Sequence, residues 1–379
     1  MASGRERRVV ILGAGFAGVG VARHLERLLG PEWEVLLISR ENYITYNPLL
    51  AEVVGASILP GHVVAPVRQM LRRARLCMAD VTGVDLQGRT LRTAEPELGP
   101  IHWDQLVLAC GVRASLDRVP GMAEHALPLK LLGDALALRN RVLNQLERAS
   151  RHPDPEARRV LTRFVVVGGG FSGVEVAGEL QDFIAGALRY YPDVDPDACR
   201  VTVVHSRDTL LNELSPSLGR YAEARMRRAG IRMRLGARVA RVDAGGVDLT
   251  DGERLEAATV VGTVGTAPMG LVERSDLPTA GGRVRTEPDL SVPGHPDVWA
   301  LGDCARVENA HDGAPAPPTA QFAVREARQL AANLARREWG LETRPFAYRS
   351  RGQLASIGHN KAVAEVFGVK VSGFPAWLL

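Results

Sequence analysis

A short glycine motif that occurs twice in the chain constrains its fold more than any other feature. At its first occurrence, Gly13, Gly15 and Gly18 follow an apolar run at residues 9–12 and precede apolar residues at helical spacing. A parallel strand buried on both faces is apolar at consecutive positions, and a second such run at 35–38 completes a strand–helix–strand unit. In that setting the first glycine permits a tight turn, the second lets the backbone approach a pyrophosphate, and the third lets helix and strand pack. The unit therefore predicts a dinucleotide at the positive end of the helix dipole.

The same pattern returns in the middle of the chain. Gly168, Gly170 and Gly173 follow the apolar run at 164–167 and precede a helical pattern, and another apolar run lies at 201–204. An internal repeat of this kind indicates that one structural unit is present twice. We therefore predict an α/β fold with two Rossmann-like dinucleotide-binding domains.

The length of 379 residues allows two or three domains. The positions of the two motifs predict that the second dinucleotide-binding domain is inserted in the first. We place the first domain at 1–150 and 270–335, the second at 151–269, and a small C-terminal element at 336–379. The charged, proline-containing segment 151–159 is the expected crossover into the second domain.

Neither unit ends its second strand on the acidic residue that usually binds the adenosine ribose. Ser39, Arg40 and Glu41 stand there in the first unit. Either the Ser39 hydroxyl or Glu41 takes that role, or Glu41 is a solvated turn residue. In the second unit His205 replaces the acid, which removes the repulsion against a 2′-phosphate that Arg207 could pair with. The sequence favours NADH and leaves NADPH open.

Two carboxylates lie where they could serve bound cofactors. Glu175 follows the second glycine motif near the start of the helix, where it is either stabilised by the helix dipole or lies close to the nicotinamide. Asp303 follows Gly302 at the end of an apolar run. In flavoproteins with two dinucleotide domains, an acid at this position lies near the ribityl chain of FAD, a role compatible with capping the next helix. Cys304 is expected to be a small buried residue rather than a redox centre.

Composition narrows the remaining function classes. The formal net charge is +4, and the arginine clusters either form solvated helix faces or attract lipid headgroups and cofactor phosphates. No aromatic residues interleave with these clusters, so we expect no nucleic-acid partner. No apolar run reaches eighteen residues, so we expect no membrane-spanning helix. The four cysteines form no CxxC pair, so we expect neither a metal site nor disulfide-reductase chemistry.

Several short motifs occur together along the chain. Residues 43–50 read YITYNPLL, residues 109–111 read ACG, and residues 168–180 read GGGFSGVEVAGEL. Further motifs lie at 300–305, 317–321, 352–361 and 372–379. In this order and combination the sequence resembles the type II, non-proton-pumping NADH:quinone oxidoreductases, over essentially its whole length.

The resemblance implies an enzyme in which a hydride passes from NADH to FAD and two electrons pass on to a membrane quinone. It implies that the first glycine motif and Asp303 hold FAD, that the second motif holds NADH, and that quinone approaches near Ala320 and Gln321. Glu175 and Gln321 are the expected catalytic residues. The expected cofactor-binding residues are Gly13, Gly15, Phe16, Ala17, Gly18, Ser39, Arg40, Glu41, Ala109, Gly111, Gly168, Gly170, Phe171, Ser172, Gly173, Glu175, His205, Gly265, Gly302, Asp303, Ala320 and Gln321.

The chain departs from the family pattern in three places. Arg325 stands where members usually carry a second glutamine, which leaves the type and affinity of the quinone open, and Cys110 replaces a common threonine. Members usually continue into amphipathic helices that lie on the membrane, whereas this chain stops at Leu379 on an apolar run, so it is either truncated or docks on lipid by this short end. His359 and Lys361 are expected to be structural or solvated, with a direct quinone contact as the alternative.

We expect a peripheral protein on the cytoplasmic side of the cell membrane, with a homodimer left open. Three alternative functions remain. A sulfide:quinone oxidoreductase shares this architecture but needs cysteines beside the flavin. A disulfide reductase needs a cysteine after the second strand, and residues 42–48 contain none. A flavoprotein that binds NAD(P)H as a redox sensor or interaction module would show little turnover.

Overall fold

The computed structural model describes residues 7–379. The chain forms two compact units, and each is assembled from three separate segments. Unit 1 contains the described residues up to Thr45, together with Val64–Arg113 and Ala267–Ser350. Unit 2 contains Tyr46–Val63, Ala114–Thr266 and Arg351–Leu379.

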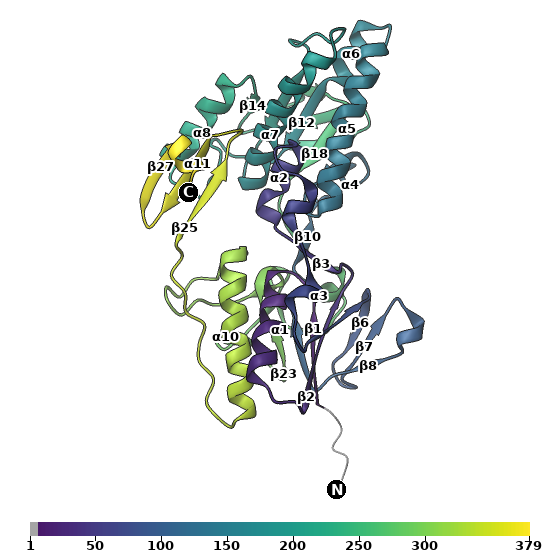
Figure 1. The fold of residues 1–379 in the computed structure, drawn as a ribbon. Coiled ribbons are helices and arrows are strands. Elements are labelled where there is room, and N and C mark those ends of the chain that lie inside the picture. The colour runs from purple at the N-terminus through teal and green to yellow at the C-terminus, as the bar shows by residue number, and fades with distance from the viewer. Residues whose placement is uncertain (1–6) are drawn as a thin grey trace. The chain divides into compact units, whose positions relative to one another are not determined.

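The core of unit 1 is a six-stranded sheet. Its strands, in sheet order, are β22 (Ser291–Val292), β23 (His295–Ala300), β9 (Gln105–Leu108), β1 (Arg7–Leu12), β2 (Trp33–Ser39) and β5 (Arg75–Met78). All pairings are parallel except that of β22 with β23 (Figure 1). Val9, Val10 and Ile11 are fully buried, so both faces of the sheet are covered, as the consecutive apolar residues predicted.

Two long helices pack together in unit 1. Helix α1 (Phe16–Leu28) connects β1 to β2 and lies beside α10 (Ala320–Glu338), as Figure 1 shows. A Cβ on Gly20 would lie 2.8 Å from that of Ala327, so glycine is what lets the two helices approach this closely. Helix α10 begins at Ala320, one of the two residues expected near the quinone. The packing of α10 on α1 therefore positions the expected quinone side of the site.

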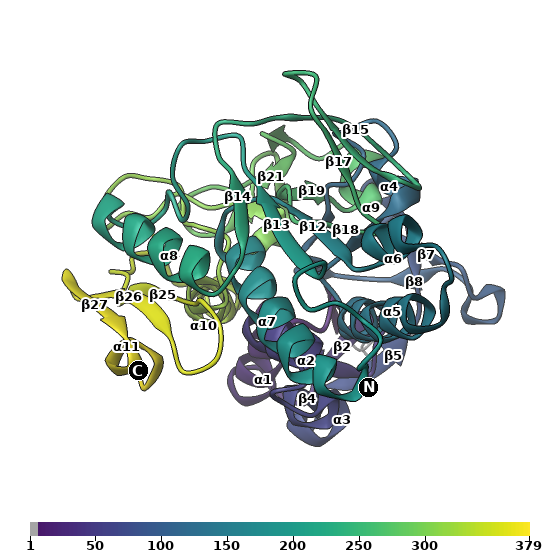
Figure 2. The ribbon, with the colours of Figure 1, turned by 90° about the horizontal axis from the view of Figure 1, so that it is seen from above.

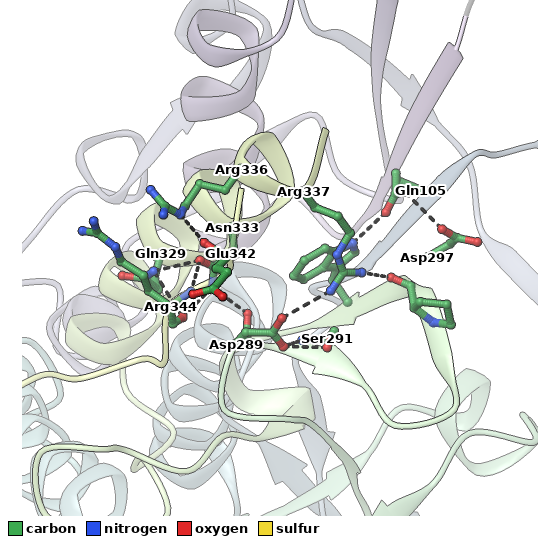
Figure 3. Close-up of polar contacts among 12 residues, drawn as sticks. Gln105, Asp289, Ser291, Asp297, Gln329, Asn333, Arg336, Arg337, Glu342 and Arg344 are labelled. Carbon is green, nitrogen blue, oxygen red and sulfur yellow. Dashed lines mark hydrogen bonds and ion pairs between the residues drawn. The ribbon is translucent and has the colours of Figure 1, made fainter. Parts of the chain in front are cut away.

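Polar contacts hold the far end of α10 to the sheet (Figure 3). The Asn333 side chain donates to the backbone oxygens of Asp289 at 2.9 Å and Arg344 at 2.7 Å. The Arg337 guanidinium lies over the Trp299 ring, 4.2 Å from its centroid, and also pairs with the Asp289 carboxylate at 3.2 Å. These contacts fix the C-terminal half of α10.

Short elements complete unit 1. Strands β6 (Val81–Asp85) and β7 (Thr90–Thr93) pair as an antiparallel hairpin through the turn at residues 86–89. The remaining elements are β3 (Tyr43–Thr45), β4 (Val64–Pro66), α3 (Val67–Met70), β8 (Ile101–His102), α9 (Gly270–Glu273), β20 (Thr279–Ala280), β21 (Arg283–Arg285) and β24 (Ala305–Arg306).

Unit 2 is built around a five-stranded parallel sheet. Its strands, in sheet order, are β11 (Ala126–Pro128), β18 (Thr259–Gly262), β12 (Arg163–Val167), β13 (Arg200–Val204) and β14 (Arg232–Arg234). The last four of these strands lie side by side in Figure 2. The α-helices of this unit that precede its C-terminal element are α2 (Leu50–Val54), α4 (Met122–His125), α5 (Leu132–Arg151), α6 (Pro155–Leu161), α7 (Phe171–Ala187) and α8 (Pro216–Arg228). A three-stranded sheet of β15 (Val239–Asp243), β16 (Gly246–Leu249) and β17 (Arg254–Glu256) is added to it.

The end of the chain belongs to unit 2. Strands β25 (Gly352–Ser356), β26 (Ala362–Val366) and β27 (Val369–Gly373) form an antiparallel sheet that carries the short helix α11 (Phe374–Trp377). The sheet contacts α8, beside which it lies in Figure 2. The Glu365 carboxylate accepts hydrogen bonds from the backbone and hydroxyl of Ser215 at 3.1 and 2.6 Å. A Cβ on Gly178 of α7 would collide with the backbone nitrogen of Gly358 at 2.6 Å.

The predicted α/β fold with two Rossmann-like halves is confirmed, but the chain crosses between its two units elsewhere than expected. The long middle segment of unit 2 begins within β10 (Val112–Ala114) and ends within β19 (Thr266–Pro268), and the chain also crosses after Thr45, Val63 and Ser350. Segment 151–159, the expected crossover, lies inside unit 2, where Asp154 caps α6 by accepting the N–H of Glu156 at 3.0 Å. Proline and charge mark a helix start there rather than a domain boundary. Which cofactor binds to each predicted range stays a prediction.

Candidate functional site

The first glycine motif forms a tight turn with one open position. Gly13 has a φ of +102°, and a Cβ on it would collide with the backbone oxygen of Ala109. A Cβ on Gly18 would collide with the backbone oxygen of Gly13. By contrast, a Cβ on Gly15 would meet nothing within 4 Å, and Gly15 is the N-cap of α1, whose first N–H groups receive no side-chain cap. This open position at a helix N-terminus fits the pyrophosphate of FAD.

Other expected flavin-site residues converge on this turn. The N–H of Ala109 donates to the backbone oxygen of Leu12 at 2.9 Å, which places residues 109–111 at the end of β1. Gly111 and Gly302 both have a left-handed backbone, with φ of +66° and +69°. A Cβ on Gly302 would lie 3.2 Å from the Cβ of Ala17 in α1. The ends of β1, β9 and β23 therefore lie together at the start of α1.

Glu326, a buried glutamate that the sequence analysis missed, holds the backbone at the end of β23. The N–H of Gly302 donates to the Glu326 carboxylate at 2.7 Å. Glu326 lies on α10 and is 2% exposed, and burial raises its pKa to about 7. The available signal was its position on the apolar face of the helix, between Ala323 and Leu330, where a charged residue needs a partner.

The end of β2 is a local turn. The Ser39 hydroxyl accepts the N–H of Glu41 at 3.3 Å. Glu41 and Arg40 are exposed, and the Glu41 carboxylate hydrogen-bonds with Tyr43, whose pKa is raised by burial and by this contact. The structure thus shows a turn role for both Ser39 and Glu41, and the ribose role of either residue stays a prediction.

Gln321, the expected residue on the quinone side, is oriented by a tyrosine. It follows the first residue of α10, and the Tyr348 hydroxyl donates to its side-chain oxygen at 2.8 Å. The guanidinium of Arg325 lies 5.2 Å from the centroid of the same ring, and Phe322 meets the ring edge-on at 5.2 Å. The arginine that replaces the family's second glutamine therefore packs on Tyr348. Sequence spacing could not reveal Tyr348, because only the return of the chain after α10 brings it to Gln321.

The second glycine motif repeats the geometry of the first in unit 2. Gly168 has a φ of +121°, and a Cβ on it would collide with the backbone oxygen of Thr263 at 2.5 Å. A Cβ on Gly173 would collide with the backbone oxygen of Gly168. Gly170 is the N-cap of α7 without a side-chain cap, and a Cβ on it would meet a single atom within 4 Å, a Glu213 carboxylate oxygen at 3.6 Å. The turn fits a second dinucleotide, which Phe171 and Ser172 would approach from the first helical turn.

His205, predicted to lie near the ribose, holds the second turn in place. Its Nδ1 accepts the N–H of Gly169 at 3.1 Å, and its Nε2 lies 3.1 Å from the Asn212 amide nitrogen. Burial lowers the pKa of His205, assisted by Arg207 and opposed by Glu213. Gly265, with a φ of +99°, accepts the N–H of Ser115 at 3.2 Å in a neighbouring loop. The cofactor contacts of His205 and Gly265 stay predictions.

Glu175 lies among buried carboxylates. It is partly buried on α7, and its carboxylate accepts the N–H of Ser356. Burial, and then the nearby carboxylate of Glu52, raise the pKa of Glu175 well above its usual value. The surroundings of the glutamate predicted to be catalytic therefore favour its protonated form.

The sequence analysis missed two partners of Glu175. Burial raises the pKa of Glu52 in α2 to about 7, and its Oε2 has no hydrogen-bond partner among residues 7–379. Glu179 lies one helical turn after Glu175, is 3% exposed and accepts the Ser57 hydroxyl at 2.7 Å; burial also raises its pKa. The spacing of Glu175 and Glu179, four residues apart on an apolar helix, could have predicted that they lie on one helix face. The contact with Glu52 could not be predicted in this way, because Glu52 comes from a distant part of the chain.

Two cysteines that are far apart in sequence hydrogen-bond to each other. Cys304 is 2% exposed, which confirms that it is buried, and its thiol donates to the backbone oxygen of Leu301 at 3.2 Å. The thiols of Cys110 and Cys304 share a hydrogen bond that lowers the pKa of Cys110 and raises that of Cys304. All four cysteines are free thiols. The absence of CxxC spacing therefore concealed a spatial pair, formed because both residues follow neighbouring strands.

Exposed apolar side chains gather on the C-terminal element of unit 2. Phe367 and Val369 at the β26–β27 turn are 75% and 62% exposed, and Leu378 and Leu379 after α11 are 65% and 66% exposed. Phe374 and Trp377 on α11 are also exposed, and their rings stack 5.8 Å apart. His359 lies nearby, with its ring 6.3 Å from that of Trp377. Within residues 7–379, no helix is both long and apolar enough to cross a membrane.

The fold of this chain is shared with solved structures of low sequence identity. The NDH2 of Plasmodium falciparum, solved in complex with NADH, superposes with a TM-score of 0.90 over 98% of this chain and 93% of its own, at 19% identity. The reduced Bacillus anthracis CoADR-RHD superposes with a TM-score of 0.76 over 95% of this chain and 61% of its own, also at 19% identity. At these identities the comparison establishes a shared fold.

Sequence comparison identifies the family. A model of the pyridine nucleotide-disulphide oxidoreductases matches residues 7–327. The type II NADH:quinone oxidoreductase Ndh of Mycobacterium tuberculosis is 34% identical, covering 99% of this chain and 83% of its own length. A type II NADH:quinone oxidoreductase of Staphylococcus epidermidis is 30% identical, covering 98% and 93%. With two dinucleotide turns and identity of this extent over its whole length, the chain belongs to the type II NADH:quinone oxidoreductases.

Proposed function

We propose that this enzyme takes a hydride from NADH onto bound FAD and passes two electrons on to a membrane quinone, without pumping protons. The observation that carries the proposal is the 34% identity to a type II NADH:quinone oxidoreductase over 99% of the chain. Two glycine turns, each with a sterically accessible central glycine at a helix N-terminus, support it further. The contact between Cys110 and Cys304 favours the alternative, a sulfide:quinone oxidoreductase. The relatives from Mycobacterium tuberculosis and Staphylococcus epidermidis, however, are both named as NADH:quinone oxidoreductases.

The residues of unit 1 bind and orient the flavin. Bound FAD accepts a hydride and releases electrons in pairs, so the protein has to supply position and electrostatics rather than a nucleophile. The N–H groups that follow Gly15 take the pyrophosphate at the positive end of α1. Glu326 holds the backbone N–H of Gly302, which fixes the strand end that presents Asp303 to the ribityl chain.

Gln321 positions the quinone in this proposal. Because the Tyr348 hydroxyl donates to its side-chain oxygen, the amide has one preferred orientation, with its nitrogen turned to the other side. An amide N–H can donate to a quinone carbonyl. Arg325 packs on Tyr348 and therefore also influences this orientation, which is how the departure from the family pattern would affect the choice of quinone.

Glu175 serves as a proton carrier in this proposal. Reduction of a quinone to a quinol consumes two protons. The surroundings of Glu175 favour its protonated form, and Glu52, with a pKa raised to about 7, can exchange a proton near neutral pH. Glu179 completes the carboxylate group by hydrogen bonding to Ser57, which keeps the helix face ordered.

The exposed apolar residues of the C-terminal element support peripheral membrane binding on the cytoplasmic side. Aromatic side chains such as Phe374 and Trp377 favour the membrane interface. The double variant Phe374→Ser, Trp377→Ser should sediment less with vesicles of anionic phospholipid while keeping turnover with a soluble quinone analogue. Equal sedimentation of the variant and the parent would contradict this part of the proposal.

Stopped-flow spectroscopy tests the reaction itself. NADH should bleach the flavin absorbance of the FAD-loaded enzyme, and a ubiquinone or menaquinone analogue should restore it without sulfide. Bleaching without reoxidation would favour the sensor, and reoxidation that requires sulfide would favour the alternative enzyme. A flavin that NADH does not reduce would refute the proposal.

A further inference from the structure

The second glycine turn differs from the first at its central glycine, where a carboxylate oxygen lies close by. We propose that Glu213 is a displaceable carboxylate that occupies the pyrophosphate position of the second turn and has to move away when NADH binds. This inference rests on the proposed binding of NADH at that turn. It adds to this site a residue that sets coenzyme affinity and that the sequence analysis did not name.

The position of Glu213 follows from the geometry of Gly170. The central glycine of such a motif lacks a side chain so that the pyrophosphate can approach the backbone. A carboxylate oxygen of Glu213 lies 3.6 Å from the place of a Cβ on Gly170, and apart from the local backbone no other part of the described chain comes within 4 Å of that place. The corresponding place at Gly15 in the first turn is empty to 4 Å. The carboxylate therefore lies where the ligand would come in.

The loop that carries Glu213 is fastened to the turn itself. The N–H of Leu211 donates to the backbone oxygen of Gly169 at 2.9 Å, and His205 accepts the N–H of the same glycine. Asn212, next to Glu213, lies 3.1 Å from the second ring nitrogen of His205. Leu211 has a φ of +51°, a costly conformation for leucine, yet it is 1% exposed, so burial of its side chain holds it there. The backbone is thus fixed close to the turn.

The Glu213 side chain, in contrast, is free to turn away. Glu213 is exposed, and among residues 7–379 its carboxylate makes no hydrogen bond or ion pair. What draws it inward is the positive end of α7, a helix of 17 residues whose N-cap Gly170 offers no side-chain cap. His205, a polar residue on the same loop, interacts electrostatically with Glu213, and the positively charged Arg207 interacts with His205. When no dinucleotide is bound, the Glu213 carboxylate thus occupies the position that the pyrophosphate would take.

A carboxylate and a pyrophosphate cannot share this position, since both are anions. NADH has to displace Glu213, and NAD⁺ leaves more readily because the carboxylate can return. Every ligand with a pyrophosphate at this turn is weakened by the same contact, including NADPH. The contact therefore lowers affinity without changing the choice between the two coenzymes and without touching the hydride.

Calorimetric titration of the FAD-loaded enzyme with ADP-ribose tests the proposal. ADP-ribose carries the pyrophosphate and both riboses but no nicotinamide, so binding is measured without turnover. Glu213→Gln should bind ADP-ribose about two- to fivefold more tightly than the parent, the range expected for one exposed charge interaction. The gain should shrink in about 1 M salt, where such interactions are screened. Glu213→Lys should bind more tightly still.

Glu124→Gln is the matched control, because Glu124 is exposed on α4 and its replacement changes the net charge equally. The control should bind like the parent. Unchanged or weaker binding by Glu213→Gln overturns the proposal, and so does a changed NADH-to-NADPH ratio with unchanged ADP-ribose affinity, which would place the carboxylate at the ribose. If the glutamine variant does not fold, Glu213→Asp, which withdraws the charge by one methylene, should bind more tightly than the parent. Failure of NADH to reduce the parent's flavin would instead count against the proposed function.

Discussion

Replacing Gly15 by alanine separates what the first turn needs for folding from what it needs for FAD. Gly15 has a φ of −78°, which alanine adopts without strain, and the added Cβ meets nothing within 4 Å. The ligand-free protein should therefore accept the methyl group. Alanine is a poorer N-cap than glycine, which costs about 1 kcal/mol at most. For a chain of 379 residues that lowers the melting temperature by about 1–2 °C.

FAD binding should suffer far more than stability. The methyl group stands where the pyrophosphate approaches, so at least one hydrogen bond from a backbone N–H to a charged oxygen is lost or lengthened. Hydrogen bonds of this kind contribute about 1.5–3 kcal/mol. The dissociation constant of FAD should therefore rise about 10- to 150-fold, and Gly15→Glu, which adds bulk and a like charge, should abolish flavin retention.

The assay is a titration of flavin-stripped protein with FAD, followed by flavin fluorescence, alongside thermal unfolding of the same ligand-free samples. Gly18→Ala is the contrasting variant, because its Cβ would collide with the backbone oxygen of Gly13. It should lose stability before any cofactor is added. If Gly15→Ala unfolds like the parent and binds FAD with the parent's affinity, the flavin pyrophosphate does not lie at this turn, and the reasoning is refuted.

Three further changes give distinct outcomes. Tyr348→Phe removes the hydrogen bond to Gln321, so the KM for quinone should rise about two- to tenfold, as expected for one neutral hydrogen bond, while flavin reduction by NADH stays as in the parent; slowed flavin reduction instead would count against a quinone-side role. Glu52→Gln tests the buried carboxylates: the folded state keeps this proton up to pH of about 7, whereas an unfolded glutamate, with a pKa near 4.5, releases it earlier, so stability falls as pH rises between these values. The melting temperature of the variant should therefore decline less than that of the parent between pH 5 and pH 8, and an equally steep decline would exclude Glu52 as the cause. Replacing Cys110 and Cys304 by serine should leave NADH:quinone turnover within about twofold if no thiol chemistry contributes, and loss of turnover in a folded variant that still holds FAD would favour the sulfide-dependent alternative.

The parts of the fold that sequence could predict are those governed by local pattern. Strands β1 and β12, the two glycine turns and helices α1 and α7 follow from apolar periodicity and from glycines at fixed spacing, and all lie where they were expected. The predicted resemblance to a family was correct because it rested on several motifs in order. The expected crossover at 151–159 was wrong because proline and charge also mark the start of a helix such as α6.

The side-chain partners of the site could not be predicted, because they depend on residues that only the fold brings together. Tyr348 reaches Gln321 after the chain turns back from α10, and the Cys110 and Cys304 thiols meet because β9 and β23 are neighbours in the sheet. Local spacing carries no record of such neighbours. Burial, which changes the pKa of Glu52 so strongly, is likewise a property of the assembled unit rather than of the sequence around Glu52.

The two glycine turns show how one motif can serve two different requirements. Flavin in such an enzyme has to stay bound through every turnover, whereas the nicotinamide coenzyme has to leave after each one. Both turns have the same steric demands at their first and third glycines, so the demands of folding do not distinguish them. They differ at the central glycine, which is unobstructed at Gly15 and faces the Glu213 carboxylate at Gly170. A resident cofactor at the first turn and an exchangeable one at the second are what this difference would produce.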